Sequence, residues 1–516
     1  MYEIITVQLG QQSNYLATHF WNAQESYFTY SESQEPLVNH DIHWRPGLGA
    51  DGTETYMPRT VIYDLKGGFG ALRKINALYE VPHEASSPQG LWSGAPVVHR
   101  EEPIQASAYQ QSLDAGRPPP QLTSNTVRYW SDYNRVFFHP RSAVQLNEFE
   151  LQSSLMPFEN WSTGEDLFAS LDKEHDLADR DLRPFVEETD QMQAIQLFAS
   201  FDDAWGGFAS HYVERLRDEY GKTPIWVWGL QESCRGVSRV KRLIRLANKA
   251  RAMTEMYKHA SLVVPVSVPP SLPRQVSMEA SSAWHTSALT ASAIESVLLP
   301  ARLRDHSNRD TLGNMSDLLN TRGKQNVAGL HMSVSSTRGE NDTDVRQAAT
   351  PNGVAESSEG VRLGLDLSPS DCLEHGHGQQ QGPHRPRIFS QLLVQRGGDG
   401  HEKDALDAEG AAARNRRRSP QETFLRSYGS SLRFPLLDSF PPIFRNDRGE
   451  LATGAVDMTA SLTTDTSVSD KLTMLRTTVT RSIGLEDREL LTHELADMAD
   501  EYREGWSSGS DDGDDD

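Results

Sequence analysis

The chain has 516 residues, of which 37% are hydrophobic, and its 72 acidic residues outnumber 50 basic ones to give a formal net charge of −22 at pH 7. This length is enough for two or more domains with a sizeable core, whereas the mean hydropathy of −0.58 indicates that part of the chain does not pack. The acidic balance argues against direct nucleic-acid binding and against attraction to anionic lipid.

Cysteine usage and hydropathy exclude further classes of protein. Cys234 and Cys372 are far apart in the sequence, so we expect neither a disulfide framework nor a cysteine-based metal site, and a reducing compartment fits. No stretch approaches the roughly 18 consecutive apolar residues of a membrane-spanning helix. The N-terminus does not resemble an arginine-rich presequence, because a core strand is predicted from residue 3. The sequence therefore predicts no transmembrane segment, no secretion and no import into a matrix.

The first 21 residues predict a strand, a tight polar loop and a helix. Apolar residues from Ile4 to Leu9 form the strand, and Gly10 permits an abrupt turn. Ser13 or Asn14 is then expected to cap the helix. A helix that opens in this way aims free N–H groups at the space above the strand end, where phosphate commonly binds. Strand–glycine–helix turns are also frequent in α/β proteins without such a site, so the unit alone leaves both interpretations open.

The next elements alternate between order and loop. A second strand is predicted over 56–65 and ends at a Lys-Gly-Gly turn at 66–68. Residues 76–126 are rich in proline, serine and glutamine, and the three prolines at 118–120 mark a stiff linker or loop. From residue 127 onward aromatic residues become dense, which implies burial.

A strand–helix–strand unit is predicted over 194–198, 207–219 and 225–228. For such a unit a right-handed crossover between parallel strands is the expected geometry. Apolar residues at helical spacing predict a further helix over 239–258. The sequence thus favours an α/β domain built on a parallel sheet.

The last third of the chain changes character. Residues 334–420 lose periodicity and fill with Gly, Ser, Gln, His and Arg, which is typical of a disordered insertion, and order is expected to resume near 432–444. A final amphipathic helix is predicted over 485–504, and its acidic polar face favours docking on the protein's own core or on a partner over a membrane. Its apolar stripe consists of Leu485, Leu490, Leu491, Leu495, Met498 and Tyr502. An acidic tail follows.

Two of these segments resemble tubulin. The loop Gly10-Gln11-Gln12-Ser13-Asn14-Tyr15 is similar to the Gly-Gln-x-Gly-Asn-Gln loop that helps tubulin to hold guanine nucleotide, with Ser13 and Tyr15 in place of a glycine and a glutamine. The strand at 56–65 is similar to the tubulin segment Val-Pro-Arg-Ala-Val-Leu-Val-Asp-Leu-Glu-Pro. The matching residues are Pro58, Arg59, Val61, Asp64 and Leu65.

Further motifs resemble the Misato family of tubulin-related proteins. They extend over nearly all of the chain outside the insertion, and the tail from Trp506 is similar to the fungal branch. The motifs are Tyr129-Trp-Ser-Asp132, His139-Pro-Arg-Ser142, Asn160-Trp-Ser-Thr-Gly164, Asp181-Leu-Arg-Pro-Phe185 and Phe434-Pro-Leu-Leu-Asp-Ser-Phe440. The resemblance implies a protein associated with mitochondria and required for organelle distribution and for inheritance of mitochondrial DNA.

The expected fold is α/β, a tubulin-like nucleotide domain with a parallel sheet flanked by helices, plus a second α+β domain interrupted by the insertion. The expected divisions are an N-terminal tubulin-like segment (1–115), a proline-rich linker (116–126), the continuation of the tubulin-like domain (127–333), the disordered insertion (334–420), a C-terminal region (421–505) and the acidic tail (506–516).

The nucleotide site that the resemblance implies is degenerate. Tubulins cradle phosphate with a Gly-Gly-Gly-Thr-Gly-Ser-Gly loop, whereas the stretch 200–210 here keeps only two adjacent glycines. Asp202 and Asp203 would bring negative charge toward a triphosphate unless a magnesium ion bridged them, and Trp205 and Phe208 add bulk. The vestigial site is predicted to comprise Gly10, Gln11, Gln12, Asn14, Gly206 and Gly207.

No catalytic residue is predicted. Hydrolysis by tubulins also needs an acidic residue that a neighbouring subunit delivers from an Asn-x-Asp loop, and the nearest candidate here is Asn308-Arg309-Asp310 in a polar stretch. We therefore expect no bound cofactor and no hydrolysis, with GTP binding as the alternative.

Other motifs are interpreted as structural. The Gly-Lys-Thr sequence at 221–223 is followed by proline and predicts a helix end and a turn. His375 and His377 lie in the insertion and do not form a predicted metal site. The basic cluster at 414–418 is interpreted as a solvated charge run, with a phosphosite at Ser419 as the alternative.

The sequence and its resemblance together predict a non-catalytic scaffold, peripheral on the cytosolic face of mitochondria and also cytoplasmic. Its predicted partner is a mitochondrial surface protein that recruits it, with tubulin or a second copy of the chain as further candidates. The first alternative function is a GTP-binding, self-assembling GTPase. The second is a module that binds microtubules through tubulin-like surfaces.

Overall fold

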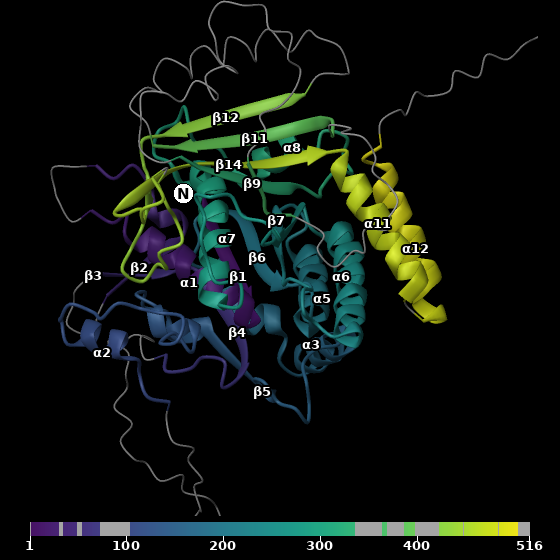
Figure 1. The fold of residues 1–516 in the computed structure, drawn as a ribbon. Helices are drawn as coiled ribbons and strands as arrows, with labels where there is room; N and C mark the ends of the chain where they lie inside the picture. Colours follow the sequence, from purple (N-terminus) through teal and green to yellow (C-terminus); the bar gives the residue numbers. More distant parts are fainter. Residues whose placement is uncertain are drawn as a thin grey trace, which may run out of the picture.

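The computed structural model describes residues 2–29, 35–48, 54–72, 104–335, 364–368, 386–397, 423–446, 448–482 and 484–503. They form two large sheets with helices packed around them (Figure 1). The acidic tail, the basic cluster at 414–418, Ser419, His375 and His377 lie outside the described residues, as do most of the residues of the predicted insertion.

The first sheet contains six strands, all parallel. In spatial order they are β5 (Ala143–Glu150), β4 (Thr60–Lys66), β1 (Glu3–Leu9), β6 (Met192–Ser200), β7 (Ile225–Gln231) and β8 (Leu262–Ser267). The central strands β1 and β6 are buried on both faces, which explains why apolar residues crowd their sequences. The predicted parallel strand–helix–strand unit is confirmed as β6, α5 (Ala204–Glu219) and β7.

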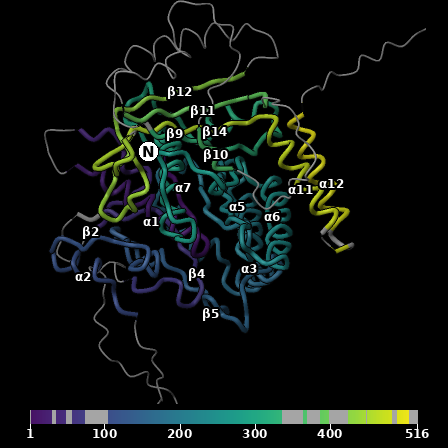
Figure 2. Tube along the Cα trace, in the orientation of Figure 1, coloured from purple at the N-terminus to yellow at the C-terminus, as the bar shows by residue number. Residues whose placement is uncertain are grey.

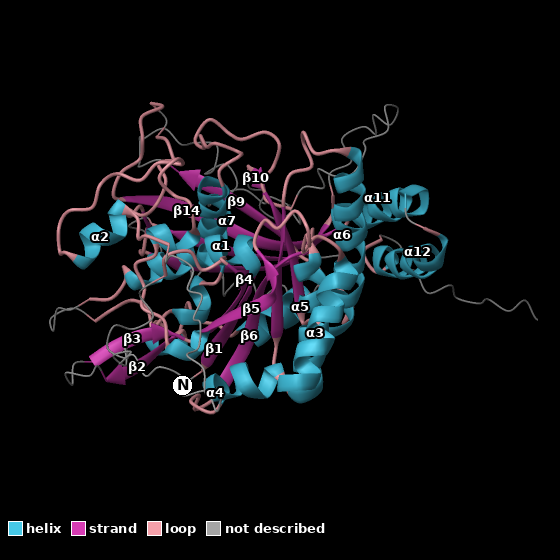
Figure 3. Ribbon diagram, turned by 90° about the horizontal axis from the view of Figure 1, so that it is seen from below, coloured by secondary structure: helices cyan, strands magenta, loops and turns pink. Residues whose placement is uncertain are grey.

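Helices cover both faces of this sheet (Figure 3). One face carries α1 (Gly10–Glu25) and α7 (Ala283–Val297), and the other carries α3 (Trp161–His175), α5 and α6 (Arg239–His259). Alternate side chains along a strand point to opposite faces, so Phe198 belongs to the core beneath α1 whereas Leu197 belongs to the core beneath α5. The expected tubulin-like architecture, a parallel sheet flanked by helices, is confirmed.

The second sheet is mixed. Its order is β10 (Leu365–Asp366), β9 (Gly329–Ser335), β14 (Ala455–Asp465), β11 (Ile388–Arg396) and β12 (Phe424–Ser430). Only β11 and β12 pair in parallel, and β13 (Phe434–Pro435) adds a short antiparallel pair with β14. Helix α8 (Leu312–Leu319) packs on this sheet and on β6, so α8 contacts both sheets, and α7 packs between this sheet and α1.

Short elements complete the described chain. They are a two-stranded sheet of β2 (Trp44–Leu48) and β3 (Glu54–Pro58), the helices α2 (Ala108–Asp114) and α4 (Arg183–Val186), the π-helical turn η5 (Ala178–Leu182), and the 3-10 turns η1 (His40–Ile42), η3 (Trp130–Tyr133), η4 (Pro140–Ser142) and η6 (Leu299–Arg302).

Two C-terminal helices lie side by side at the edge of the molecule, next to α6 (Figure 2). They are α11 (Ser467–Ser482), which the sequence did not predict, and α12 (Leu485–Asp500), which it did. Leu495 and Tyr502 are fully buried, so the expected docking on the protein's own core is confirmed. Leu490 is 63% exposed, which corrects its assignment to the apolar stripe.

The predicted insertion contains a core strand. Residues 388–396 form β11, which pairs with β14 on one side and with β12 on the other, and Leu392 is fully buried. The expectation of disorder over 334–420 is therefore wrong for 386–397 and for the short strand at 365–366. Order also resumes earlier than residue 432, because β12 begins at Phe424.

Several local expectations are corrected. Helix α1 begins at Gly10 itself and has no side-chain cap, so Ser13 and Asn14 lie inside it. The strand predicted over 56–65 is divided at Arg59 between β3 and β4. Helix α2 lies within the stretch 76–126 that is rich in proline, serine and glutamine, and it ends just before the linker predicted over 116–126.

Two further observations concern cysteine and membranes. Cys234 is disulfide-bonded, contrary to the expectation from the sequence, and Cys372 lies outside the described residues. Among the residues that the structure describes, no helix combines the length and the apolar character needed to cross a membrane.

Candidate functional site

The carboxyl ends of β1, β4 and β6 meet at one edge of the first sheet, as parallel strands require. Gly10 follows β1 with a φ of +80°, a backbone conformation that favours glycine. Gly67 and Gly68 form the turn after β4, and Asp202 and Asp203 follow β6. The structure thus brings the segments that were predicted to form a nucleotide site to a common edge.

The space beside the β1–α1 turn is occupied by an indole ring. A Cβ atom added at Gly10 would lie 2.3 Å from Nε1 of Trp205, so the ring sits directly against the glycine. Trp205 is 4% exposed, and its ring contacts those of Phe158 and Phe208 at centroid distances of 5.2 and 5.6 Å. An aromatic cluster from α5 and from the segment before α3 therefore fills the space next to the turn.

Two of the predicted nucleotide ligands bind a carboxylate of the chain itself. Gln11 Nε2 and Asn14 Nδ2 donate to Oδ2 of Asp64, at the end of β4, over 2.6 and 2.7 Å. Gln11 Nε2 also lies 2.7 Å from the carbonyl oxygen of Gly68, to which it donates. Gln12 is half-buried, and its side chain makes no hydrogen bond within the part of the chain that the structure describes.

Asp64 is fully buried, and this burial dominates its ionisation. Burial raises the pKa of Asp64 to about 7, against the hydrogen bonds from Asn14, the Leu65 N–H group and Gln11, which favour the ionised form. The carboxyl group therefore titrates near neutral pH in the folded protein.

Gly206 and Gly207 lie in the first turn of α5, not in a loop. A Cβ atom at Gly207 would lie 2.2 Å from the carbonyl oxygen of Trp161, and one at Gly164 would lie 1.7 Å from that of Ala204. Both glycines permit α3 and α5 to touch through their backbones, a packing role that the sequence argument missed. The sequence signal that could have indicated this packing role is that each glycine lies near the start of its helix, Gly164 in α3 and Gly207 in α5.

Asp202 and Asp203 both accept hydrogen bonds from backbone N–H groups. Asp203 caps α5 by accepting from the Trp205 N–H group at 2.9 Å, and Asp202 Oδ2 accepts from the Glu232 N–H group at 2.5 Å. Burial raises the pKa of Asp202 to about 6, although Lys249 opposes the shift, and raises that of Asp203 to about 7. Oδ1 of Asp202 is buried without a hydrogen-bond partner.

The remaining sequence candidates have structural roles. Asp310 Oδ2 accepts from Tyr428 Oη at 2.6 Å, and Asn308 Oδ1 accepts from the Gly429 N–H group at 3.1 Å, so the Asn-x-Asp segment is joined to β12. The Gly-Lys-Thr sequence at 221–223 forms a turn after α5, as predicted. Within the described ranges, no group of three or more His, Cys, Asp or Glu side chains is placed to hold a metal ion.

A buried ion cluster, which the sequence argument also missed, joins distant parts of the chain. Glu295 on α7 pairs with Arg302 at 2.5 Å and with Arg396 at the end of β11, and Arg396 donates to Tyr27 Oη at 2.7 Å. Burial alone would raise the pKa of Glu295, but the two guanidinium groups hold it below its ordinary value.

Comparisons with known proteins show which family models and which proteins this chain is similar to. The chain matches the family model for the Misato Segment II tubulin-like domain over residues 2–115 and the model for a tubulin domain over residues 119–303. It is 61% identical to "Protein dml-1" of Neurospora crassa and 47% identical to "Protein DML1" of Gibberella zeae, in both cases over 100% of each chain. It is 32% identical to "Protein dml1" of Schizosaccharomyces pombe, over 59% of this chain and 66% of that one.

Proposed function

Because this chain belongs to the Misato family of tubulin-like proteins, we propose that it acts as a non-catalytic scaffold at the cytosolic surface of mitochondria. In this role it supports the distribution of mitochondria and the inheritance of mitochondrial DNA, as the family resemblance implies. We expect a mitochondrial surface protein to recruit it, because a net charge of −22 opposes binding to anionic lipid.

The observation that carries the non-catalytic character is the contact between Trp205 and Gly10. A nucleotide phosphate needs open space and free donors beside the β1–α1 turn, and the indole ring takes that space. The engagement of Gln11 and Asn14 with Asp64 supports the same conclusion, because their amide groups already donate within the chain. The two glycines of α5 serve helix packing in this proposal.

One observation favours the alternative, a GTP-binding protein that self-assembles. Helix α1 opens at the end of β1 without a side-chain cap, so N–H groups of its first turn stay available to an anion. Rotation of the Trp205 side chain would be needed before phosphate could approach them.

Guanine-nucleotide binding to the full-length protein separates the two functions. We expect no saturable signal when fluorescently labelled GTP is titrated into the wild-type protein with magnesium. A Trp205→Ala variant, which opens the space beside Gly10, tests whether the ring is the obstacle; Trp226→Ala, on the opposite face of the sheet, is the control for lost aromatic packing. Micromolar binding by the wild-type protein would contradict the scaffold.

Two assays test the proposed location. In cells depleted of this chain, we expect mitochondria to distribute unevenly at division and mitochondrial DNA to be lost over generations. In flotation assays at physiological salt, we expect the purified protein not to bind protein-free liposomes of mitochondrial lipid composition. Tight liposome binding would overturn recruitment through a protein, and cosedimentation with microtubules would favour the microtubule-binding alternative.

A further inference from the structure

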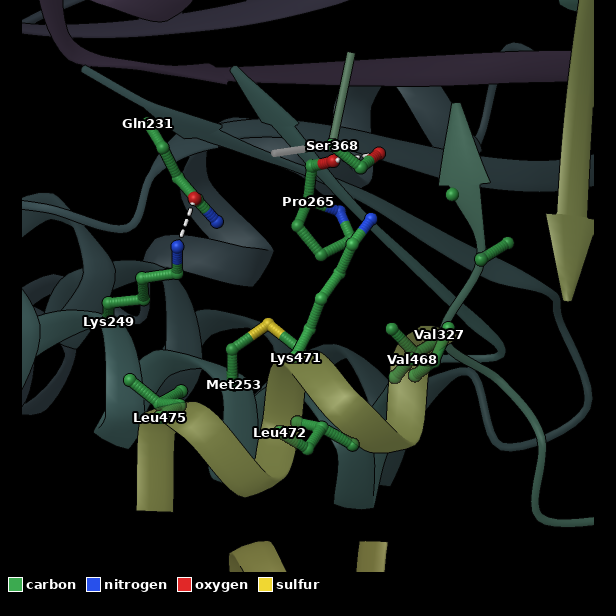
Figure 4. A pocket seen from close by; sticks show the side chains of 12 residues that line it. Gln231, Lys249, Met253, Pro265, Val327, Ser368, Val468, Lys471, Leu472 and Leu475 are labelled. Carbon is green, nitrogen blue, oxygen red and sulfur yellow. Dashed lines mark hydrogen bonds between the residues drawn. The ribbon is translucent and has the colours of Figure 1, made fainter. Parts of the chain in front are cut away.

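A cavity of about 40 Å³ lies between the first sheet and the C-terminal helix α11 (Figure 4). It opens beside the ends of β7 and β8, and its walls come from α6, the start of β9 and α11. It faces the α6 side of the sheet and is separate from the β1–α1 turn.

One part of the cavity wall is cationic and rich in donors. Lys249 on α6 is 7% exposed, and its Nζ donates to Oε1 of Gln231 at 2.5 Å. Nε2 of the same glutamine is buried without a hydrogen-bond partner. Lys471 reaches in from α11, and its Nζ donates to the rim carboxylate of Asp366 at a long 3.4 Å.

The other part of the wall is apolar. Met253 on α6 and Leu472 and Leu475 on α11 line it (Figure 4). All three are at most 3% exposed. A wall that combines buried donors with aliphatic side chains fits a ligand that has a polar head and an apolar body. An unpartnered buried N–H group is costly, and an acceptor on a ligand would satisfy it.

The charges around the cavity limit the head group. Asp366 lies beside Lys471, and the carboxyl group of Asp202 interacts electrostatically with Lys249, so the two ammonium groups are partly balanced. A head group with one negative charge therefore matches the site better than a doubly charged phosphate ester does.

We propose that this cavity binds a small carboxylate with a short aliphatic tail. The carboxylate accepts from Lys471, Lys249 and the free amide N–H of Gln231, and the tail lies against Met253 and the leucines of α11. Because the walls belong to α6 and α11, the ligand would link the C-terminal helices to the tubulin-like sheet. This site is independent of the proposed scaffold function and of any nucleotide.

The test is a calorimetric titration of the full-length protein with octanoate, octyl phosphate and inorganic phosphate. We expect saturable octanoate binding, which Lys471→Met weakens about tenfold or more because a charge-assisted hydrogen bond is lost. Lys241→Met, at an exposed position of α6 that is paired with Glu159, should leave the affinity unchanged. Absent octanoate binding, equal affinity in Lys471→Met, or tighter binding of either phosphate would overturn the proposal.

A second measurement uses only the wild-type protein, so it does not depend on whether a variant folds. With methionine methyl groups labelled by carbon-13, the signal of Met253 is expected to shift when octanoate is added. Met57, which lies on β3 far from α6 in the sequence and outside the cavity wall, serves as the internal control. A shift of other methionines without Met253 would place the ligand elsewhere and overturn the assignment.

Discussion

At the scale of single residues, the ion cluster around Glu295 shows how a buried charge is tolerated. Glu295, Arg302 and Arg396 are each at most 2% exposed, and each would be costly to bury alone. The carboxylate faces two guanidinium groups, and the hydroxyl group of Tyr27 accepts from one of them. The cluster therefore fixes α7, β11 and the turn after α1 relative to one another.

Replacing Glu295 by glutamine should be strongly destabilising. The Glu295→Gln change leaves two buried guanidinium groups without a counter-charge, and we expect the free energy of unfolding to fall by about 3 to 5 kcal/mol. Urea denaturation followed by circular dichroism measures the effect. Glu255→Gln removes an exposed pair with Lys258 and should cost at most about 1 kcal/mol. A similar loss in both variants would show that the buried cluster is no more important than a surface pair.

Asp64 gives a prediction about pH. In the unfolded chain this carboxyl group ionises near its ordinary pKa of 3.8, whereas burial raises the folded pKa to about 7. The folded state therefore holds more protons than the unfolded state between these values, so the contribution of Asp64 to stability is present at low pH and is lost as pH rises toward 7.

The variant Asp64→Asn removes this titration. We expect the fall in its urea midpoint from pH 4 to pH 7 to be smaller than that of the wild-type protein, since asparagine does not ionise. Asp202→Asn is a useful comparison, because the pKa of Asp202 is raised only to about 6 and its effect should end at lower pH. Identical pH profiles for wild type and Asp64→Asn would contradict the assignment.

At the scale of elements, the contact of α3 with α5 depends on glycine. Gly207→Ala would place a Cβ atom 2.2 Å from the carbonyl oxygen of Trp161, and the helices would have to separate. We expect a loss of about 1 to 3 kcal/mol in the free energy of unfolding. Gly206→Ala is the matched control, because its nearest neighbour, the Ser200 carbonyl oxygen, is 3.3 Å away. Denaturation midpoints in which Gly206→Ala is the more damaging change would contradict this account.

The sequence predicts elements well where the signal is local. The strands β1, β6 and β7 and the helices α6 and α12 follow from apolar periodicity within short windows. The sequence does not predict strand β11, although 388–396 contains an apolar run. The composition of the flanking segments is typical of disorder, and it outweighs the strand signal of these nine residues. Its order depends on pairing with β14, more than 60 residues away, which no local pattern reports.

The candidate site shows the same limit. Gly10, Gln11 and Asn14 could be placed near a strand end from the sequence, since the strand–helix unit is local. The position of Trp205 against Gly10 could not, because it depends on how α5 packs beside a turn 195 residues earlier in the chain. The sequence predicts Asp202 and Asp203 only as negative charges that oppose a triphosphate. It does not indicate that both accept hydrogen bonds from backbone N–H groups.

At the scale of the whole molecule, the C-terminal helices complete the core. Tyr502 is fully buried, and its hydroxyl group accepts from the Val327 N–H group at 2.7 Å and donates to the Val327 carbonyl oxygen at 3.1 Å. Gln325 Nε2 also donates to the carbonyl oxygen of Glu501. Glu501 and Tyr502, which follow α12, therefore fix the position of the segment that leads into β9 of the mixed sheet.

Removing residues 485–516 should therefore destabilise the core of the protein as well as remove the terminal helix. It uncovers the apolar faces of α6 and α11 against which Leu495 and Tyr502 pack, and it leaves the backbone of Val327 without its hydroxyl partner. We expect a lower thermal midpoint and increased binding of a hydrophobic dye, whereas removal of 504–516 alone should change neither, because the buried residues of α12 and Tyr502 remain. Equal behaviour of the two truncations would show that α12 is dispensable for the core, and the C-terminal helices would then be an appendage rather than part of the fold.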